Sequence, residues 1–271
     1  MKHSKKGEYY GNHNTIQEYS GLVVTDTEYT HDFVDWHYHE NAYFTYILEG
    51  NLFEANKKEA YQCGAGSLLF HNWQDPHYNR KSTPRVHGFH IECDKNWFDV
   101  FGLKLDAVQG SQRIEHPSVK TLFHKIYIES KYTHPTSALT TEDLLLQIFS
   151  ELTQPPLSNK IAPHWVKKVK DIIYEQYDSS LTLHDLAKEL NVHPVHLSRA
   201  FPQHFHTTLS AYMRTVKVEK SLLYLSNPSM SLSEVAYNCG FADQSHFIRC
   251  FKAVFHINPL MYRKNVLKQG C

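Results

Sequence analysis

The sequence is poor in cysteine, and its cysteines form neither close pairs nor a metal-ligand spacing. The five of them are scattered along 271 residues, at Cys63, Cys93, Cys239, Cys250 and Cys271. Disulfide-stabilised domains concentrate their cysteines, so this usage is typical of proteins from a reducing compartment. The composition therefore argues against a secreted, disulfide-rich fold.

Long hydrophobic runs are also missing. No window approaches the roughly 20 apolar residues that a helix needs to cross a bilayer, although 41% of the residues are hydrophobic. The first residues, MKHSKKGEYYGNHN, are basic and polar and lack the apolar segment of a signal peptide. We therefore expect a cytoplasmic protein that has no membrane partner.

The chain as a whole has no net charge, with 28 basic and 28 acidic residues, but its two halves are not neutral. Residues 1–159 hold 14 Lys and Arg against 20 Asp and Glu, a balance of −6. Residues 160–271 hold 14 against 8, a balance of +6. Because a basic surface attracts a polyanion, only the second half is predicted to bind nucleic acid.

The acidic half has the pattern of strands followed by helices. From residue 21 to about residue 95, short runs of β-branched and aromatic residues alternate with Gly, Asn and Pro, which predicts a β-domain. Two stretches with helical spacing follow within residues 117–152. We expect the polar, proline-containing residues 154–160 to link a domain of residues 1–153 to a domain of residues 161–271.

The basic half is predicted to be helical, and it contains one short pattern twice. Five identical pairs lie 50 positions apart: Arg199 and Arg249, Phe201 and Phe251, Phe205 and Phe255, His206 and His256, and Tyr212 and Tyr262. The helices before the two copies also match, with Ala187 aligned to Ala236. Such a repeat indicates one structural task that is performed twice.

The residues that follow the two alanines identify this task. Asn191 and Gly240 each come four residues after the alanine. A small residue lets a second helix pack closely, and Gly or Asn tolerates the positive φ of the turn between the helices. We therefore predict two helix-turn-helix motifs, at about residues 182–205 and 231–255.

The outward faces of the two second helices predict contacts with base edges. Each face centres on an arginine, whose guanidinium can donate two parallel hydrogen bonds to guanine O6 and N7. At 100° per residue the outward or flanking positions are Val195, His196, Ser198, Arg199, Ser245, Ile248, Arg249 and Lys252. Two base-contacting helices that are joined by a third helix are suited to successive major-groove faces of double-stranded DNA.

Residues 160–265 resemble the DNA-binding domain of the AraC family of transcriptional regulators, above all in SLSEVAYNCGFADQSHFIRCFKAVFHINPLMYR. The resemblance implies an all-α unit of seven helices that binds promoter DNA, and it adds Gln244 to the predicted contacts. It also implies a small-molecule effector and a homodimer formed through the N-terminal domain. Pro202 departs from the family pattern, and we expect it to kink the first recognition helix or end it early.

Three histidines in the acidic half predict a site inside the β-domain. His37 and His39 lie two apart on an expected strand, so both point to one face, and His77 follows a second strand. The spacing resembles the cupin β-barrel, in which H-x-H, an acidic residue and a third histidine hold a metal. Here Tyr43 stands where the acidic ligand is usual.

Several interpretations of these histidines remain open. They can form hydrogen bonds within the barrel, line an organic-effector pocket with Tyr43, or bind zinc or iron through His37, His39 and His77. The sequence favours an effector pocket without a metal or other cofactor. The predicted function is thus a sequence-specific transcription regulator and not an enzyme. The alternatives are a cupin metalloenzyme with a helical appendage and a regulator whose vestigial barrel only dimerises.

Overall fold

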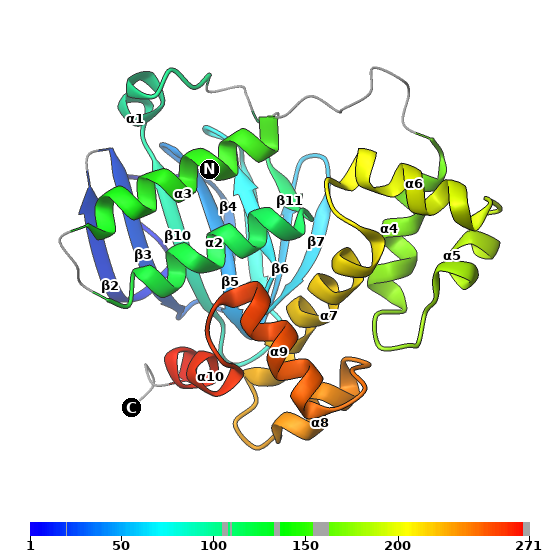
Figure 1. Ribbon diagram of the computed structural model, residues 1–271. Helices are drawn as coiled ribbons and strands as arrows, with labels where there is room; N and C mark the ends of the chain where they lie inside the picture. Colours follow the sequence, from blue (N-terminus) through cyan, green and yellow to red (C-terminus); the bar gives the residue numbers. More distant parts are fainter. Residues whose placement is uncertain (20, 105–107, 109, 133–135, 154–162, 268–271) are drawn as a thin grey trace. The chain divides into compact units, whose positions relative to one another are not determined.

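A computed structural model describes residues 1–19, 21–104, 108, 110–132, 136–153 and 163–267 (Figure 1). The linker expected at 154–160 lies outside the described residues, as does Cys271. Backbone contacts divide the chain into two compact units. One contains residues 1–153 together with the residues from Lys264 onward, and the other contains the intervening residues up to Arg263.

The first unit is built on two β-sheets. In spatial order, the five-stranded sheet consists of β1 (Lys2–Ser4), β4 (Phe33–His39), β9 (His77–Lys81), β6 (Asn51–Asn56) and β7 (Ala60–Gly64). The six-stranded sheet consists of β11 (Gln112–Ile114), β8 (Leu68–His71), β5 (Ala42–Glu49), β10 (His87–Cys93), β3 (Leu22–Tyr29) and β2 (Gly11–Tyr19). The expected cupin-like domain is therefore present, but as two separate sheets and not as a closed barrel.

The strands begin earlier in the chain than residue 21, where we expected the β-domain to start. β2 pairs antiparallel with β3, and β1 pairs parallel with β4. The sequence of β2, GNHNTIQEY, is largely polar, and most of its side chains are exposed or half-buried. Pairing with a neighbouring strand, rather than an alternating apolar pattern, keeps this segment extended.

Helices cover the outer face of the six-stranded sheet. They are α2 (Pro117–Glu129) and α3 (Ser137–Thr153), with the short α1 (Lys95–Val100) close by (Figure 1). The ring of Phe44 on β5 lies 5.5 Å from that of Phe123 on α2 and 5.6 Å from that of Phe149 on α3. The apolar stripes predicted at 117–152 therefore pack on their own sheet, and the alternate β5 residues, such as Tyr43, face the other sheet.

The described part of the second unit is helical. Its elements are α4 (Trp165–Glu175), α5 (Leu183–Glu189), α6 (Pro194–Phe205), α7 (Leu209–Leu225), α8 (Leu232–Asn238), α9 (Gln244–Phe255) and the first part of α10 (Pro259–Leu267), up to Arg263. A core that includes Trp165, Leu186, Phe201 and Val216 holds α4 to α7 together. Helices α5 and α6 form the first helix-turn-helix and α8 and α9 the second, while α7 connects them.

Both helix-turn-helix motifs begin with the same cap. Thr182 and Asp185 form a capping box at α5, and Ser231 and Glu234 form one at α8, as their spacing predicts. The turns are also equivalent, since Asn191 has φ 53° and Gly240 has φ 67°. The sequence prediction of two helix-turn-helix motifs is therefore confirmed in its local geometry.

Pro202 does not end the first recognition helix, so the expectation of an early end was wrong, while the expected kink stays a prediction. Helix α6 continues through Pro202 to Phe205, and the amide of His206 donates to the carbonyl of Pro202 at 3.0 Å. The proline removes one hydrogen bond to the carbonyl of Ser198, whose side chain is exposed. Because Ser198 lies on the exposed face of α6, we expect water to replace the lost donor.

Candidate nucleic-acid interface and histidine cluster

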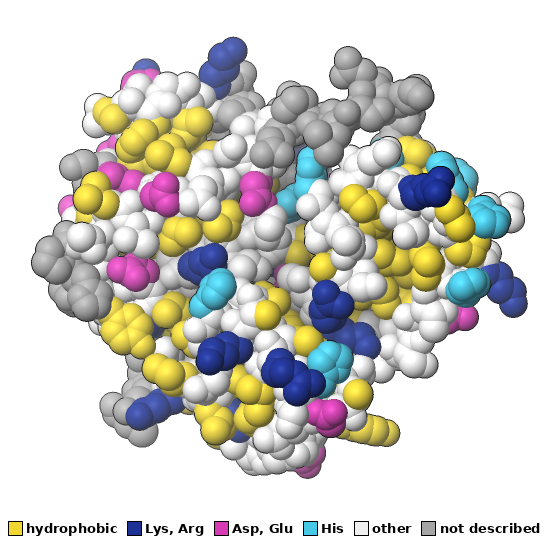
Figure 2. All heavy atoms as spheres, in the orientation of Figure 1, with side chains coloured by type: hydrophobic (Ala, Val, Ile, Leu, Met, Phe, Trp, Pro, Cys, Tyr) yellow, Lys and Arg dark blue, Asp and Glu magenta, His cyan; other side chains and the backbone are white. Residues whose placement is uncertain are grey.

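The arginines at the centre of the predicted reading faces are both exposed. Arg199 is the sixth residue of α6, and Arg249 is the sixth residue of α9. Basic and histidine side chains gather over the helices of this unit in Figure 2. Both guanidinium groups are therefore accessible to a ligand on the surface of their own unit.

The other predicted contact residues have the same exposure with one exception. Exposed side chains belong to Val195, His196, Ser198, Gln244, Ser245 and Lys252. Ile248 is half-buried. Gln244 is also held in place, because its side-chain oxygen accepts a hydrogen bond of 2.6 Å from the Ser233 hydroxyl. Contact of these residues with DNA stays a prediction.

Equivalent aromatic residues pack on the buried faces of the two recognition helices. Phe201 and Phe251 are both fully buried. The ring of Phe201 lies 5.5 Å from that of Tyr212, and the ring of Phe251 lies 5.6 Å from that of Tyr262. Because these pairs anchor the inner faces of α6 and α9, the outer faces are presented in equivalent ways by the two motifs.

A hollow of about 450 Å³ between α7 and α9 adds residues that the sequence analysis missed. It is lined by Arg214 and Thr215 from α7 and by His246, Arg249 and Cys250 from α9, among others. Arg214 lies on the exposed side of α7, outside the two recognition helices to which the sequence prediction was confined. Two arginines around one hollow make this part of the surface suitable for a phosphate group.

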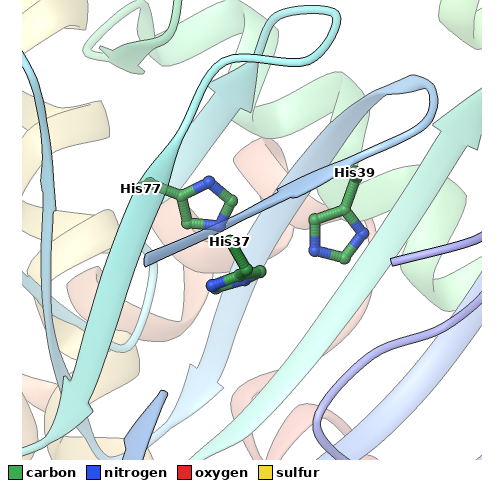
Figure 3. A group of neighbouring side chains, drawn as sticks. All are labelled: His37, His39 and His77. Carbon is green, nitrogen blue, oxygen red and sulfur yellow. The ribbon is translucent and has the colours of Figure 1, made fainter. Parts of the chain in front are cut away.

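The three histidines expected in the β-domain do come together. Imidazole nitrogens of His37, His39 and His77 lie within 4.8 Å of one another, and each side chain is 3% exposed or less. His37 and His77 are direct partners in the β4–β9 pairing. Figure 3 shows the three rings turned towards a common space.

Backbone carbonyls orient two of these rings. Nδ1 of His37 lies 2.9 Å from the carbonyl oxygen of Asp35, and Nδ1 of His77 lies 3.3 Å from that of Asp75. A carbonyl only accepts, so both Nδ1 atoms carry the proton and both Nε2 atoms keep a lone pair. The Tyr43 hydroxyl donates to Nε2 of His77 at 3.0 Å.

A second group adjoins the first and was not found from the sequence. Ligand atoms of Glu54, His71 and His77 also lie within 4.8 Å of one another. His71 is the direct partner of Tyr43 in the β5–β8 pairing, and the two rings stack at 4.2 Å. The FEAN and LLFH stretches carry no H-x-H signal, so only strand pairing reveals that Glu54 and His71 belong to this site.

Burial sets the protonation of both groups. It lowers the pKa of His77 to about 3, and it holds the pKa values of His39 and His71 well below their ordinary value. It also raises the pKa of Glu54 to about 8. At neutral pH the rings are therefore uncharged lone-pair donors and Glu54 is mostly a neutral acid. Such a cluster can coordinate a cation or form hydrogen bonds to a polar ligand.

Both ring nitrogens of another buried histidine, His90, form hydrogen bonds within the protein. Nδ1 of His90 lies 3.1 Å from the Thr25 hydroxyl, and its Nε2 lies 2.7 Å from the Tyr29 hydroxyl. By contrast, Nδ1 of His39 and both ring nitrogens of His71 have no hydrogen-bond partner among the described residues. Nε2 of His71 does lie 3.5 Å from a carboxylate oxygen of Glu54. Since a buried polar atom normally has a partner, these nitrogens are candidates for contact with a ligand.

Two family models match the chain. One, an AraC-like ligand binding domain, matches residues 20–149, and the other, a helix-turn-helix domain, matches residues 186–265. The Msm operon regulatory protein of Streptococcus mutans is 34% identical over 40% of this chain and 39% of its own length. The uncharacterized HTH-type transcriptional regulator YbfI of Bacillus subtilis is 26% identical over 78% of this chain and 80% of its own.

A solved structure of ToxT from Vibrio cholerae aligns with 92% of this chain and all of its own, at 12% identity and a TM-score of 0.39. Among the described residues of this protein, no helix is long and apolar enough to cross a membrane.

Proposed function

Because the chain belongs to the AraC family of transcriptional regulators, we propose that it reads promoter DNA with α6 and α9. It is a DNA-binding regulator with a ligand-binding N-terminal domain. In the proposed complex the two helices lie in successive major grooves, and Arg199 and Arg249 each donate to a guanine. The predicted contacts of the neighbouring side chains complete the two half-sites.

The observation that supports this proposal is the equivalence of the two exposed arginines. Each is the sixth residue of a 12-residue helix that follows a turn with positive φ. The connecting helix α7 has 17 residues and is therefore about 25 Å long. Two recognition helices joined by a helix of this length are suited to groove faces about 34 Å apart.

The test begins with DNA selected from a random library by the full-length protein. Gel shifts at several salt concentrations then compare the wild type with Arg249→Ala on the selected sequence and on single-base variants of it. We expect a loss of about 1–3 kcal/mol and relaxed preference at one base pair. Arg80→Ala, which removes an exposed arginine of the first unit, is the control. An equal loss on every sequence would contradict the base-reading role.

We further propose that a small-molecule effector binds between the two sheets near His37, His39, Tyr43 and His77. The support is that these polar groups are buried together and that two of the rings have fixed tautomers. A ligand that binds only the folded state raises the melting temperature, so a thermal-shift screen of metabolites tests this role. The effector is expected to change DNA affinity as well, because regulation requires the two units to be coupled.

The remaining aspects of the proposal rest on the family. We infer that the protein acts in the cytoplasm, as a regulator without catalytic activity, and that two copies associate through their N-terminal domains. The apolar stripes of α2 and α3 are largely buried against the chain's own sheet. A dimer would therefore use residues on the outer side of these helices, such as Leu139, which is 67% exposed. Sedimentation of the wild type and Leu139→Glu tests this contact.

A further inference from the structure

We infer that the hollow between α7 and α9 binds one phosphate group of the DNA backbone through Arg214. The inference rests on the proposed function, because it requires α9 to lie in a major groove. It deepens that function by adding a contact from α7, the helix that connects the two helix-turn-helix motifs.

The first argument is the lining of the hollow. The side chains that line it from α9 are three or four residues apart and so form one stripe, which consists of His246, Arg249, Cys250 and Ala253. Arg214 lines it from α7. Among the described residues no acidic side chain contributes to this lining. The hollow is therefore basic and suited to an anion.

The second argument is the availability of Arg214. Its side chain is exposed, and it forms no ion pair and no side-chain hydrogen bond with any described residue. The neighbouring Thr215 differs, because its hydroxyl already donates to the carbonyl of Ala211 at 3.0 Å. The guanidinium of Arg214 can therefore offer all its N–H donors to a phosphate, with which it forms charge-assisted hydrogen bonds.

The two arginines also act on a common point of the hollow. Burial raises the pKa of the Cys250 thiol, and the positive charges of Arg214 and Arg249 act against this rise. Both charges therefore lie near Cys250. An anion bound beside Arg214 would also feel the charge of Arg249.

The third argument is the part of the DNA that Arg214 can meet. The major groove is about 12 Å wide, and a helix with its side chains is about 10–12 Å across. A recognition helix thus fills the groove, so that a helix packed against it lies beside the sugar-phosphate backbone. Because α7 packs against α9, Arg214 meets a phosphate near the base pair that Arg249 contacts, and not a base edge.

The first measurement compares Arg214→Ala with the wild type, both full-length, on the selected DNA at several salt concentrations. We expect affinity to fall roughly tenfold, and by the same factor on the single-base variants of that DNA. The slope of log affinity against log salt concentration should become shallower by about 0.9, the value for one phosphate. Arg214→Lys keeps the charge and should keep the slope. Lys167→Ala, which removes an exposed base of α4 in the same unit, is the matched control and should also keep the slope.

The second measurement locates the phosphate. Uncharged methylphosphonate linkages replace the phosphates of the selected DNA one at a time. One linkage near the base pair that Arg249 contacts should weaken wild-type binding roughly tenfold and weaken binding by Arg214→Ala no further. Equal losses in both proteins at every linkage would overturn the assignment. Circular dichroism identifies any variant that fails to fold, and Arg214→Gln then replaces Arg214→Ala.

Failure of this inference can be distinguished from failure of the proposed function. If Arg214→Ala binds as the wild type does while Arg249→Ala relaxes preference at one base pair, only the phosphate contact is overturned. It is also overturned if Arg214→Ala itself relaxes preference at one base pair. Calorimetry with inorganic phosphate tests a free anion as the occupant, and phosphate binding that Arg214→Ala abolishes, with an unchanged salt slope for DNA, would exclude the backbone contact. A wild type without salt-dependent binding to any DNA would overturn both proposals.

Discussion

Arg199 and Arg249 occupy the same position in two recognition helices that the chain builds in the same way. Both are sixth in helices of 12 residues, and both helices end at a left-handed histidine, His206 with φ 53° and His256 with φ 59°. The turn before a helix and the cap after it determine which of its side chains face outward. Because α6 and α9 have equivalent turns and caps, they expose equivalent faces. The repeat in the sequence thus corresponds to a repeat in the structure. We expect the turn residues to be as important for the two motifs as the arginines are.

Gly240→Ala should destabilise the second helix-turn-helix strongly. Gly240 has φ 67°, and a Cβ at this position would meet the carbonyl oxygen of Asp178 at 2.3 Å. Left-handed backbone costs an L-residue roughly 1–2 kcal/mol, and the clash adds to that cost. We expect a loss of at least about 2 kcal/mol in the free energy of unfolding, measured by urea denaturation of the full chain.

The first motif provides the control for this change. Asn191 holds the equivalent turn with φ 53°, so Asn191→Gly keeps the conformation and should change the free energy of unfolding by less than about 1 kcal/mol. If Gly240→Ala were as well tolerated as Asn191→Gly, the positive φ would not be what fixes this turn.

The helical half was largely predictable because its determinants are local. The capping boxes at Thr182 and Ser231 and the turn residue Asn191 can each be recognised within a few residues of sequence. The effect of Pro202 could not, since it depends on whether the carbonyl of Ser198 meets solvent. In the β-domain His37 and His39 were found through their alternation, whereas Glu54 joins the cluster only through strand pairing.

Asp26→Asn should destabilise the first unit at neutral pH. Asp26 is fully buried, and it accepts hydrogen bonds from His87 at 2.5 Å and from Lys131. Burial opposes its ionisation, but the hydrogen bond and charge of His87 and Lys131 outweigh burial and place the pKa of Asp26 below its usual value. Removal of one member of such a buried group costs about 3–5 kcal/mol.

The pH dependence of the stability loss in Asp26→Asn follows from the direction of the pKa shift of Asp26. A carboxylate whose pKa is lower in the folded state stabilises the fold above its unfolded pKa of about 4. The difference between the wild type and Asp26→Asn should therefore be constant near neutral pH and shrink as the pH falls below about 4. Asp32→Asn is the control, because Asp32 pairs with Lys81 but its side chain is 95% exposed. A difference that grows in acid would contradict the assigned ionisation.

Pro202→Ala should stabilise α6 without changing its ends. Proline inside a helix costs about 3 kcal/mol relative to alanine, but part of this cost is recovered here because proline restricts the unfolded chain. We expect a gain of about 1–2 kcal/mol in the free energy of unfolding. Pro194→Ala is the matched control, since proline is favoured at the first helical position and its loss should give no gain. An equal gain in the free energy of unfolding from both variants would mean that the cost of a proline does not depend on its position in the helix.

Arg199→Ala and Arg249→Ala should relax specificity at two different base pairs about one helical turn, or 10 base pairs, apart. The expectation follows from the proposed function, in which each arginine donates to a guanine in its own groove. Two contacts that share no partner should contribute additively, so the double variant should lose the sum of the two single losses within about 0.5 kcal/mol. Binding to a series of single-base variants of the selected site, measured with all three proteins, locates the affected positions. If both substitutions relaxed the same base pair, or if only one affected any base pair, the two helices would not act as independent readers.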